Sequence, residues 1–123
     1  MHHDKAVKKS IESPDETRPF PNGSGSMRVL DLGEHTLGYM QFRPGWRWSK
    51  DIGPAAGTAS CQIDHYIYLV SGRMTVKMDD GSQLDFGPGD AAHIPPGHDA
   101  WIVGNQACVA LDWTGAASYA KPR

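Results

Sequence analysis

The sequence predicts an all-β domain built as a sandwich or a barrel. Short segments rich in β-forming residues recur at spacings of about eight to twelve residues, with turn signals between them, which is typical of such folds. Glycine (14) and proline (9) are plentiful, as many short turns require. No segment after the N-terminal region shows helical periodicity, and 123 residues are enough for one domain with its own core.

The first 26 residues differ from the rest, and we expect them to form an irregular arm ahead of a barrel domain at 27–123. Residues 5–12 could begin a short helix or an edge strand, but the proline and glycine residues that follow interrupt regular structure. Two interpretations stay open. The arm is either a flexible tail, or it packs its apolar side chains on its own barrel or on a partner subunit. These side chains are Val7, Ile11 and Phe20.

The barrel domain contains eight segments with the composition of strands. Turn residues separate them, and Asp80-Gly81 is the strongest hairpin signal because this pair supplies the positive φ of a tight turn. Residues 43–50 and 52–59 are expected to be loops. The expected strands are 27–32, 36–42, 61–69, 73–78, 83–86, 91–94, 98–103 and 107–113.

Alternation in the strand expected at 61–69 separates two kinds of side chain. One face carries Cys61 and His65 among isoleucine and leucine, and the other carries Tyr66 and Tyr68. A thiol and an imidazole are both good metal ligands, and here they lie in register on a face that is otherwise apolar. This face is therefore either a site or a core with two unusual members.

The last expected strand carries the second cysteine. We expect Val109, Leu111 and Trp113 to form its buried face, so that Cys108 looks outward together with Asp112. Two cysteines are too few for a disulfide framework.

Two motifs give the sequence a resemblance to the cupin superfamily, whose fold is a small jelly roll. In cupins a ligand glutamate lies seven residues before a glycine, and Gly72 matches that glycine. Counting back from Gly72 puts His65 at the glutamate position and Cys61 at the second ligand position. The first ligand position holds Ala59.

The second cupin motif begins with Gly-Asp, continues to Pro-x-Gly, and ends in a ligand histidine three residues after that glycine. Gly89-Asp90 and residues 95–97 match it, but Ala100 holds the histidine position and a histidine occurs at His98 instead. The resemblance covers about residues 37–113 and implies a cupin-type jelly roll with an altered ligand set. The sequence also resembles a subgroup of small cupins with a Cys-x-x-x-His strand and a Pro-Pro-Gly-His-Asp-Ala-Trp turn.

Because the strands after the two motifs are neighbours in a jelly roll, the resemblance implies that His98 can approach Cys61 and His65. One thiolate and two imidazoles with an open fourth position suit Zn²⁺ best among divalent metals, and iron, nickel or copper less specifically. The thiolate argues against Mg²⁺ and Ca²⁺. In the alternative interpretation Cys61 is a small buried residue and both histidines are hydrogen-bonded members of the core.

Several residues are candidates for the surroundings of this site. Trp48 and Trp101 could line the mouth of a pocket or a dimer contact. Asp99 could orient His98, or it could bond to a turn or to another subunit. His93 is a weaker candidate ligand because its parity opposes that of Ile94. Simple packing is expected for two further tryptophans and a surface position for three further histidines. These are Trp46, Trp113, His2, His3 and His35.

The net charge and the hydropathy of the chain limit the kinds of partner that it is expected to bind. A net charge of −2 gives no electrostatic footprint for nucleic acid, and no apolar run approaches the ~20 residues that span a bilayer. The first residues lack the apolar centre of a signal peptide, so we expect a cytoplasmic protein. Tyr66, Tyr68 and Trp101 would form an exposed apolar patch on the outer sheet face, which favours a homodimer.

Three functions are compatible with these observations. The first is a small metal-binding cupin that acts on or binds a small polar metabolite. The alternative is a non-catalytic ligand-binding or sensor module with no metal. A third is a structural role, with a closed core and no ligand. A fold-level resemblance does not choose the substrate.

Overall fold

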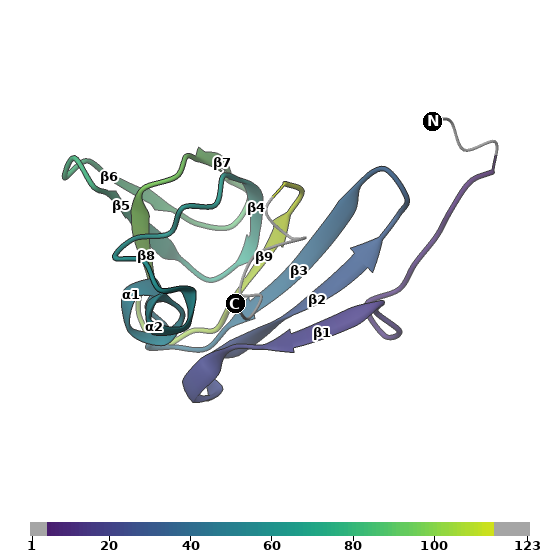
Figure 1. Cartoon of the computed structure of the whole chain (residues 1–123), viewed down its shortest axis with the longest axis horizontal. Helices are drawn as coiled ribbons and strands as arrows, with labels where there is room; N and C mark the ends of the chain where they lie inside the picture. The colour runs from purple at the N-terminus through teal and green to yellow at the C-terminus, as the bar shows by residue number, and fades with distance from the viewer. Residues whose placement is uncertain (1–4, 115–123) are drawn as a thin grey trace.

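The structure is a computed structural model that describes residues 5–114, and it consists of two antiparallel β-sheets around one apolar core (Figure 1). The all-β prediction is confirmed. The larger sheet has the strand order β1 (Glu16–Pro19), β2 (Gly25–Asp31), β3 (Thr36–Phe42), β9 (Cys108–Asp112), β4 (His65–Ser71) and β7 (Ala91–Ile94). The smaller sheet has the order β6 (Gln83–Phe86), β5 (Met74–Met78) and β8 (His98–Ile102).

The larger sheet extends into the segment expected to be an irregular arm. β1 pairs with β2 along its whole length, and Figure 1 shows β1, β2 and β3 side by side, reaching beyond the barrel. β1 lies at the sheet edge, where Pro19 can be accommodated although it has no N–H to donate. Of the three apolar residues of this segment, Phe20 is buried against Phe42, Ile11 is half-buried and Val7 is exposed.

Two short helices occupy the region expected to be loops, so that expectation is wrong in part. They are α1 (Trp48–Asp51) and α2 (Gly53–Ala56), and a 3₁₀ turn, η1 (Pro21–Gly23), precedes β2. Single turns are too short to show helical periodicity in a sequence. Figure 1 places both helices at one end of the barrel, next to β8. No helix in the described part of the chain is long and apolar enough to cross a membrane.

The expected orientation of β9 is wrong, although its alternation is right. Cys108 and Asp112 are fully buried, whereas Trp113 is 48 % exposed. The inner side chains of β9 are small or paired: a Cβ on Gly72 would lie 2.7 Å from the Cα of Cys108, and Asp112 bonds to His65. A prediction from hydrophobicity alone buries Val109, Leu111 and Trp113. It takes no account of the close approach of Gly72 to Cys108 or of the bond between Asp112 and His65.

The outer face of the larger sheet carries the two tyrosines as expected, and both are exposed on β4. Trp101 is not part of that face, because it lies on β8 in the other sheet and packs beneath the guanidinium of Arg47. The expected patch therefore lacks its tryptophan.

Candidate metal centre

Cys61 lies outside the strand that it was expected to open. β4 begins at His65, and Cys61 instead forms an isolated antiparallel bridge with His98. The N–H of Cys61 donates to the carbonyl of His98 (2.7 Å), and the N–H of Gly97 donates to the carbonyl of Cys61 (2.7 Å). The bridge fixes the backbone of Cys61 beside that of His98, in a position that the pleat of β4 does not determine.

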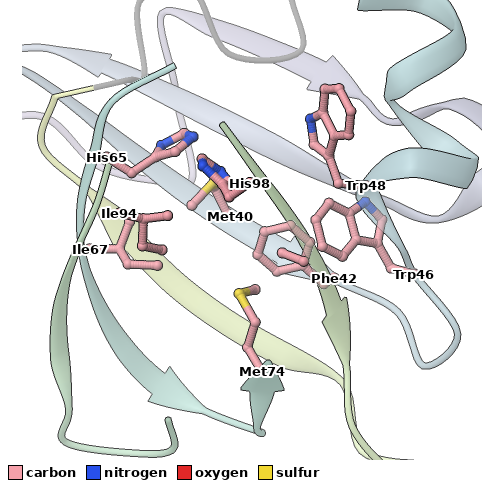
Figure 2. A pocket seen from close by; sticks show the side chains of 10 residues that line it. Met40, Phe42, Trp46, Trp48, His65, Ile67, Met74, Ile94 and His98 are labelled. Atoms are coloured by element: carbon pink, nitrogen blue, oxygen red, sulfur yellow. The ribbon is translucent and has the colours of Figure 1, made fainter. Parts of the chain in front are cut away.

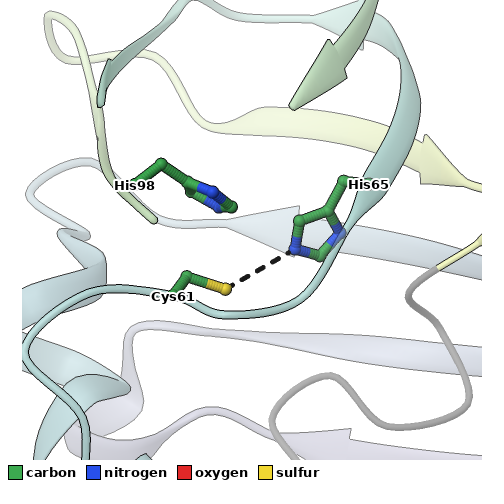
Figure 3. A group of neighbouring side chains, drawn as sticks. All are labelled: Cys61, His65 and His98. Atoms are coloured by element: carbon green, nitrogen blue, oxygen red, sulfur yellow. Dashed lines mark hydrogen bonds between the residues drawn. The ribbon is translucent and has the colours of Figure 1, made fainter. Parts of the chain in front are cut away.

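The three expected ligands converge at the end of the barrel (Figure 3). Cys61 comes from the segment before β4, His65 is the first residue of β4, and His98 is the first residue of β8. One ligand atom from each residue lies within 4.8 Å of the other two. All three side chains are buried, with exposed fractions of 1 %, 4 % and 3 % in chain order.

Each imidazole is oriented by a hydrogen bond at its Nδ1 atom. His65 Nδ1 lies 2.6 Å from Oδ2 of Asp112, and His98 Nδ1 lies 2.8 Å from the carbonyl oxygen of Pro95. A proton on each Nδ1 satisfies these acceptors and leaves Nε2 as the inward atom. Metal-binding histidines are commonly held by such outer partners.

Asp112 is a site residue that the sequence reasoning placed on the wrong face. It is fully buried in β9, and its second carboxylate oxygen accepts from the N–H of Thr114 (3.0 Å). Parity groups Asp112 with Cys108, but no local pattern says that this face meets His65. The contact depends on the pairing of β9 with β4, where Asp112 lies opposite Ile67.

The surroundings of Cys61 and His65 shift their pKa values in opposite directions. Burial raises the pKa of the Cys61 thiol, but hydrogen bonds with His65 and then His98 outweigh burial and lower that pKa to about 6. Burial lowers the pKa of His65, but the hydrogen bonds with Asp112 and then Cys61 raise it to about 9. Without a metal, the pair at neutral pH is a thiolate facing an imidazolium, with Sγ and Nε2 3.7 Å apart.

The donor set fits a divalent metal of the zinc type. Tetrahedral zinc holds sulfur at about 2.3 Å and nitrogen at about 2.0–2.1 Å, which places a sulfur and a nitrogen ligand about 3.6 Å apart. The observed 3.7 Å between Cys61 Sγ and His65 Nε2 is close to that spacing. A thiolate and two oriented imidazoles are ligand types that zinc accepts. Their role as ligands remains a prediction.

A cavity adjoins the two histidines (Figure 2). Water molecules can occupy about 30 Å³ of it, and its empty space is about 340 Å³ when the part open to solvent is included. Trp48 lines it, as expected for a pocket residue, and so does Trp46, for which only packing was expected. The lining residues are Met40, Phe42, Trp46, Trp48, His65, Ile67, Met74, Ile94, His98 and Ala100.

Two other candidates lie elsewhere. The carboxylate of Asp99 accepts hydrogen bonds from Arg47 Nε (3.0 Å) and from the N–H and hydroxyl of Ser49 (2.9 and 2.8 Å), so it ties β8 to α1. The carboxylate of Asp99 is thus bonded to the start of a short helix, and the imidazole of His98 is oriented by Pro95 instead. Trp101 is not among the cavity residues.

Neither His93 nor His35 belongs to the cluster. His93 is exposed, stacks on Tyr66 and bonds to Asp64 through Nε2 (2.8 Å). His35 is exposed. His2 and His3 lie outside the described residues.

Comparison with known proteins gives one family match. Residues 31–114 match the family described as the EutQ-like cupin domain. No curated protein matches the sequence.

Several solved structures share the fold. A cupin-superfamily sugar phosphate isomerase from Silicibacter pomeroyi aligns with a TM-score of 0.62 at 17 % identity, covering 87 % of this chain and 74 % of its own. A protein of unknown function from Rhizobium leguminosarum gives 0.61 at 22 %, covering 89 % and 96 %. A putative ethanolamine utilization protein Q from Salmonella typhimurium gives 0.51 at 17 %, covering 75 % and 70 %. At these identities the likeness concerns the fold alone.

Proposed function

This chain belongs to the EutQ-like cupin family, and we propose that it is a small cupin that binds one divalent metal through Cys61, His65 and His98. The observation that carries the proposal is the convergence of three buried donors within 4.8 Å of one another. Two of them replace the residue types that the cupin resemblance implies, and the third has moved along its strand. The altered set still supplies one sulfur and two nitrogen donors.

Zinc is the metal that this donor set favours, with iron, nickel and copper as less specific alternatives. A lowered thiol pKa supports the proposal because the thiolate is the form that binds metal. When bound, such a metal supplies Lewis acidity and lowers the pKa of a bound water. The metal centre would serve a small molecule held in the adjoining cavity, whether that molecule is converted or only bound.

The residues around the donors support the same role. Asp112 and the carbonyl of Pro95 hold the two imidazoles at their Nδ1 atoms, so each ring keeps one orientation. Trp46 and Trp48 line the same cavity as the two histidines and add apolar surface to it. Burial of these oriented donors strengthens the electrostatic interactions among them.

A binding module without a metal is the second candidate. It is favoured by the internal pairing of the cluster, since Cys61, His65 and Asp112 already form a chain of two hydrogen bonds. In that case the thiolate and imidazolium neutralise each other, and only the cavity has a function.

Metal analysis separates the two candidates. We expect elemental analysis of the purified chain to find close to one equivalent of metal, and a loss of it in Cys61→Ser and in His98→Ala. Cys108→Ser is the matched control, because Cys108 is equally buried but is not part of the cluster. Metal retained at the same level in all variants, or absent from the wild type after growth in zinc-supplemented medium, would contradict the metal proposal.

We also propose a cytoplasmic homodimer. Both cysteines are free, which suits a reducing compartment. On the outer face of the larger sheet, strand register aligns Tyr39, Leu111 and Tyr68 in one row across β3, β9 and β4. A second copy covering this row would remove it from water. Light scattering should give twice the monomer mass for the wild type and a smaller mass for Tyr68→Glu, and a monomeric wild type would contradict the proposal.

A further inference from the structure

We infer that the cavity beside His65 and His98 selects a small uncharged molecule with an apolar body and one polar atom, such as a short alcohol or carbonyl compound, and rejects phosphorylated ligands. The inference rests on the proposed function in one respect: the polar atom of the ligand would interact with the metal centre at Cys61, His65 and His98. The sequence predicts a small polar metabolite, and the lining of the cavity restricts this class to uncharged molecules with a single polar atom.

The walls of the cavity are almost entirely apolar. Eight of its ten lining residues are aliphatic, aromatic or methionine side chains, and the other two are the histidines. Figure 2 shows the imidazoles of His65 and His98 together on one side, with Trp46 and Trp48 across from them and Met74 at the lower end. Besides the imidazoles, the polar side-chain atoms of the lining residues are the indole N–H groups of Trp46 and Trp48, and Trp46 Nε1 has no hydrogen-bond partner. Hydroxyl groups of a ligand that lie away from these few atoms would be buried without hydrogen bonds, which is unfavourable.

No lysine or arginine side chain lines the cavity, and His65 is already paired with Cys61 and Asp112. The arginine and lysine of the neighbouring helical segment are engaged outside it: Arg47 pairs with Asp99, and Lys50 donates to the carbonyl of Gly45. Within the centre, the two positive charges of a divalent metal would be balanced by the Cys61 thiolate and the Asp112 carboxylate. A phosphate dianion would thus enter an apolar, neutral site with no charge to compensate it, which is strongly unfavourable.

The size of the cavity sets the scale of the ligand. About 30 Å³ is available to water, and a single water needs roughly 10–15 Å³ by this measure. A cavity that holds benzene is on the order of 150 Å³. The enclosed part thus accepts a short linear group of two or three heavy atoms, and the part open to solvent can hold the remainder of the molecule.

Three compounds with the same carbon skeleton test the inference on the full chain. Propan-1-ol, glycerol and glycerol 3-phosphate differ only in added hydroxyl and phosphate groups, and saturation-transfer NMR detects weak binding of each. We expect transfer to propan-1-ol and none to the other two. Ethanol should bind about fourfold more weakly than propan-1-ol, because it buries one methylene fewer.

Two cavity variants locate the binding. Ala100→Leu fills the cavity from β8 without altering a donor, and should abolish the propan-1-ol signal. Ala91→Leu makes the same change at an exposed position of β7 and should leave the signal as in the wild type. Met74→Val enlarges the cavity and should shift the preference from propan-1-ol towards butan-1-ol, which tests the site independently should Ala100→Leu fail to fold.

Three results would overturn the inference. They are binding of glycerol 3-phosphate that equals binding of propan-1-ol, no binding of propan-1-ol, and an unchanged propan-1-ol signal in folded Ala100→Leu. The series is measured on metal-loaded and on chelator-treated protein, with metal content determined in parallel. A metal-free chain that keeps the propan-1-ol preference retains the ligand class and loses the metal proposal. If the chain binds metal at the three donors but prefers the phosphorylated compound, the metal proposal is retained and the inferred ligand class is wrong.

Discussion

Cys61 and Cys108 are both buried thiols of one small barrel, but their surroundings act on them in opposite directions. Burial raises the pKa of Cys108 to about 12, whereas hydrogen bonds with His65 and His98 overcome burial at Cys61 and lower its pKa to about 6. Cys108 opens β9 opposite Phe42, in the apolar layer between β3 and β4. Cys61 lies where a connecting segment meets the starts of two strands.

The difference shows that burial alone does not make a thiol inert. Side chains within a central strand are surrounded by those of its neighbours, so the inner face of β9 is mostly small or apolar. At the end of the barrel, segments from distant parts of the sequence meet and bring polar groups to one point. The cysteine with the lowered pKa is therefore the one held by a bridge between segments, and the cysteine with the raised pKa is the one within the sheet.

The largest predicted effect is a separation of the two thiols by pH. In chelator-treated protein, the ultraviolet absorbance of thiolate should rise with a midpoint near pH 6 from Cys61, and Cys108 should ionise only near 12. Cys61→Ala should remove the lower transition, and Cys108→Ala should leave it in place. Ionisation of both thiols near the ordinary value of 9 would contradict the proposed contrast.

The second prediction removes the charge that supports the cluster. Asp112→Asn keeps the shape of the side chain but should lower the pKa of His65 and raise that of Cys61. Because the variant leaves a buried histidine without its anionic partner, we expect a loss of about 3–5 kcal/mol of unfolding free energy near neutral pH. Metal affinity should fall by about 10–100-fold, as is usual when an outer partner of a ligand is lost.

The pH dependence of that loss follows from His65. Its folded pKa of about 9 exceeds the ordinary 6.5, so its contribution is fully present below pH 6.5 and disappears as pH rises through 9. The gap in stability between wild type and Asp112→Asn should therefore narrow at alkaline pH in denaturant titrations. A gap that widens with pH would show that Asp112 acts through some group other than His65.

The smallest predicted effect concerns Cys108. Cys108→Ala should cost about 1–2 kcal/mol of unfolding free energy at neutral pH, because it removes a buried sulfur from a packed layer. Above pH 9 the unfolded chain loses the thiol proton while the folded chain keeps it to about 12, so wild-type stability should fall by about 1.4 kcal/mol per pH unit. The variant lacks this dependence, and its stability curve should converge with that of the wild type in chemical denaturation at alkaline pH.

Most of the fold was predictable because its signals are local. Asp80-Gly81 and Gly72 mark turns whose glycines have positive φ values of 92° and 82°. Apart from β1, which was not expected, and β4, which begins at His65 and not at Cys61, the strands begin and end close to the predicted positions. The cupin resemblance from two such turn motifs is confirmed by the family match. The short helices at 48–56 were missed because one turn leaves no periodic pattern.

The sequence predicted which three residues form the cluster, but it predicted only some of the residues that surround and orient them. Spacing from Gly72 and from Gly97 identified Cys61, His65 and His98, which the structure brings together. Asp112 was placed outside, and Asp99 was considered for the orienting role that Asp112 has at His65. Trp46 was assigned to packing alone, yet it lines the cavity.

The sequence by itself determined the strand alternation, the turns and the identity of the three clustered residues, because each depends on neighbours within a few positions of the chain. Tertiary structure decided which face of β9 is buried, which carboxylate holds His65 and how apolar the adjoining cavity is. These features depend on strand pairing between residues far apart, such as Ile67 with Asp112 and Cys61 with His98. Parity fixes which side chains share a face, but only the packed sheets determine what that face meets.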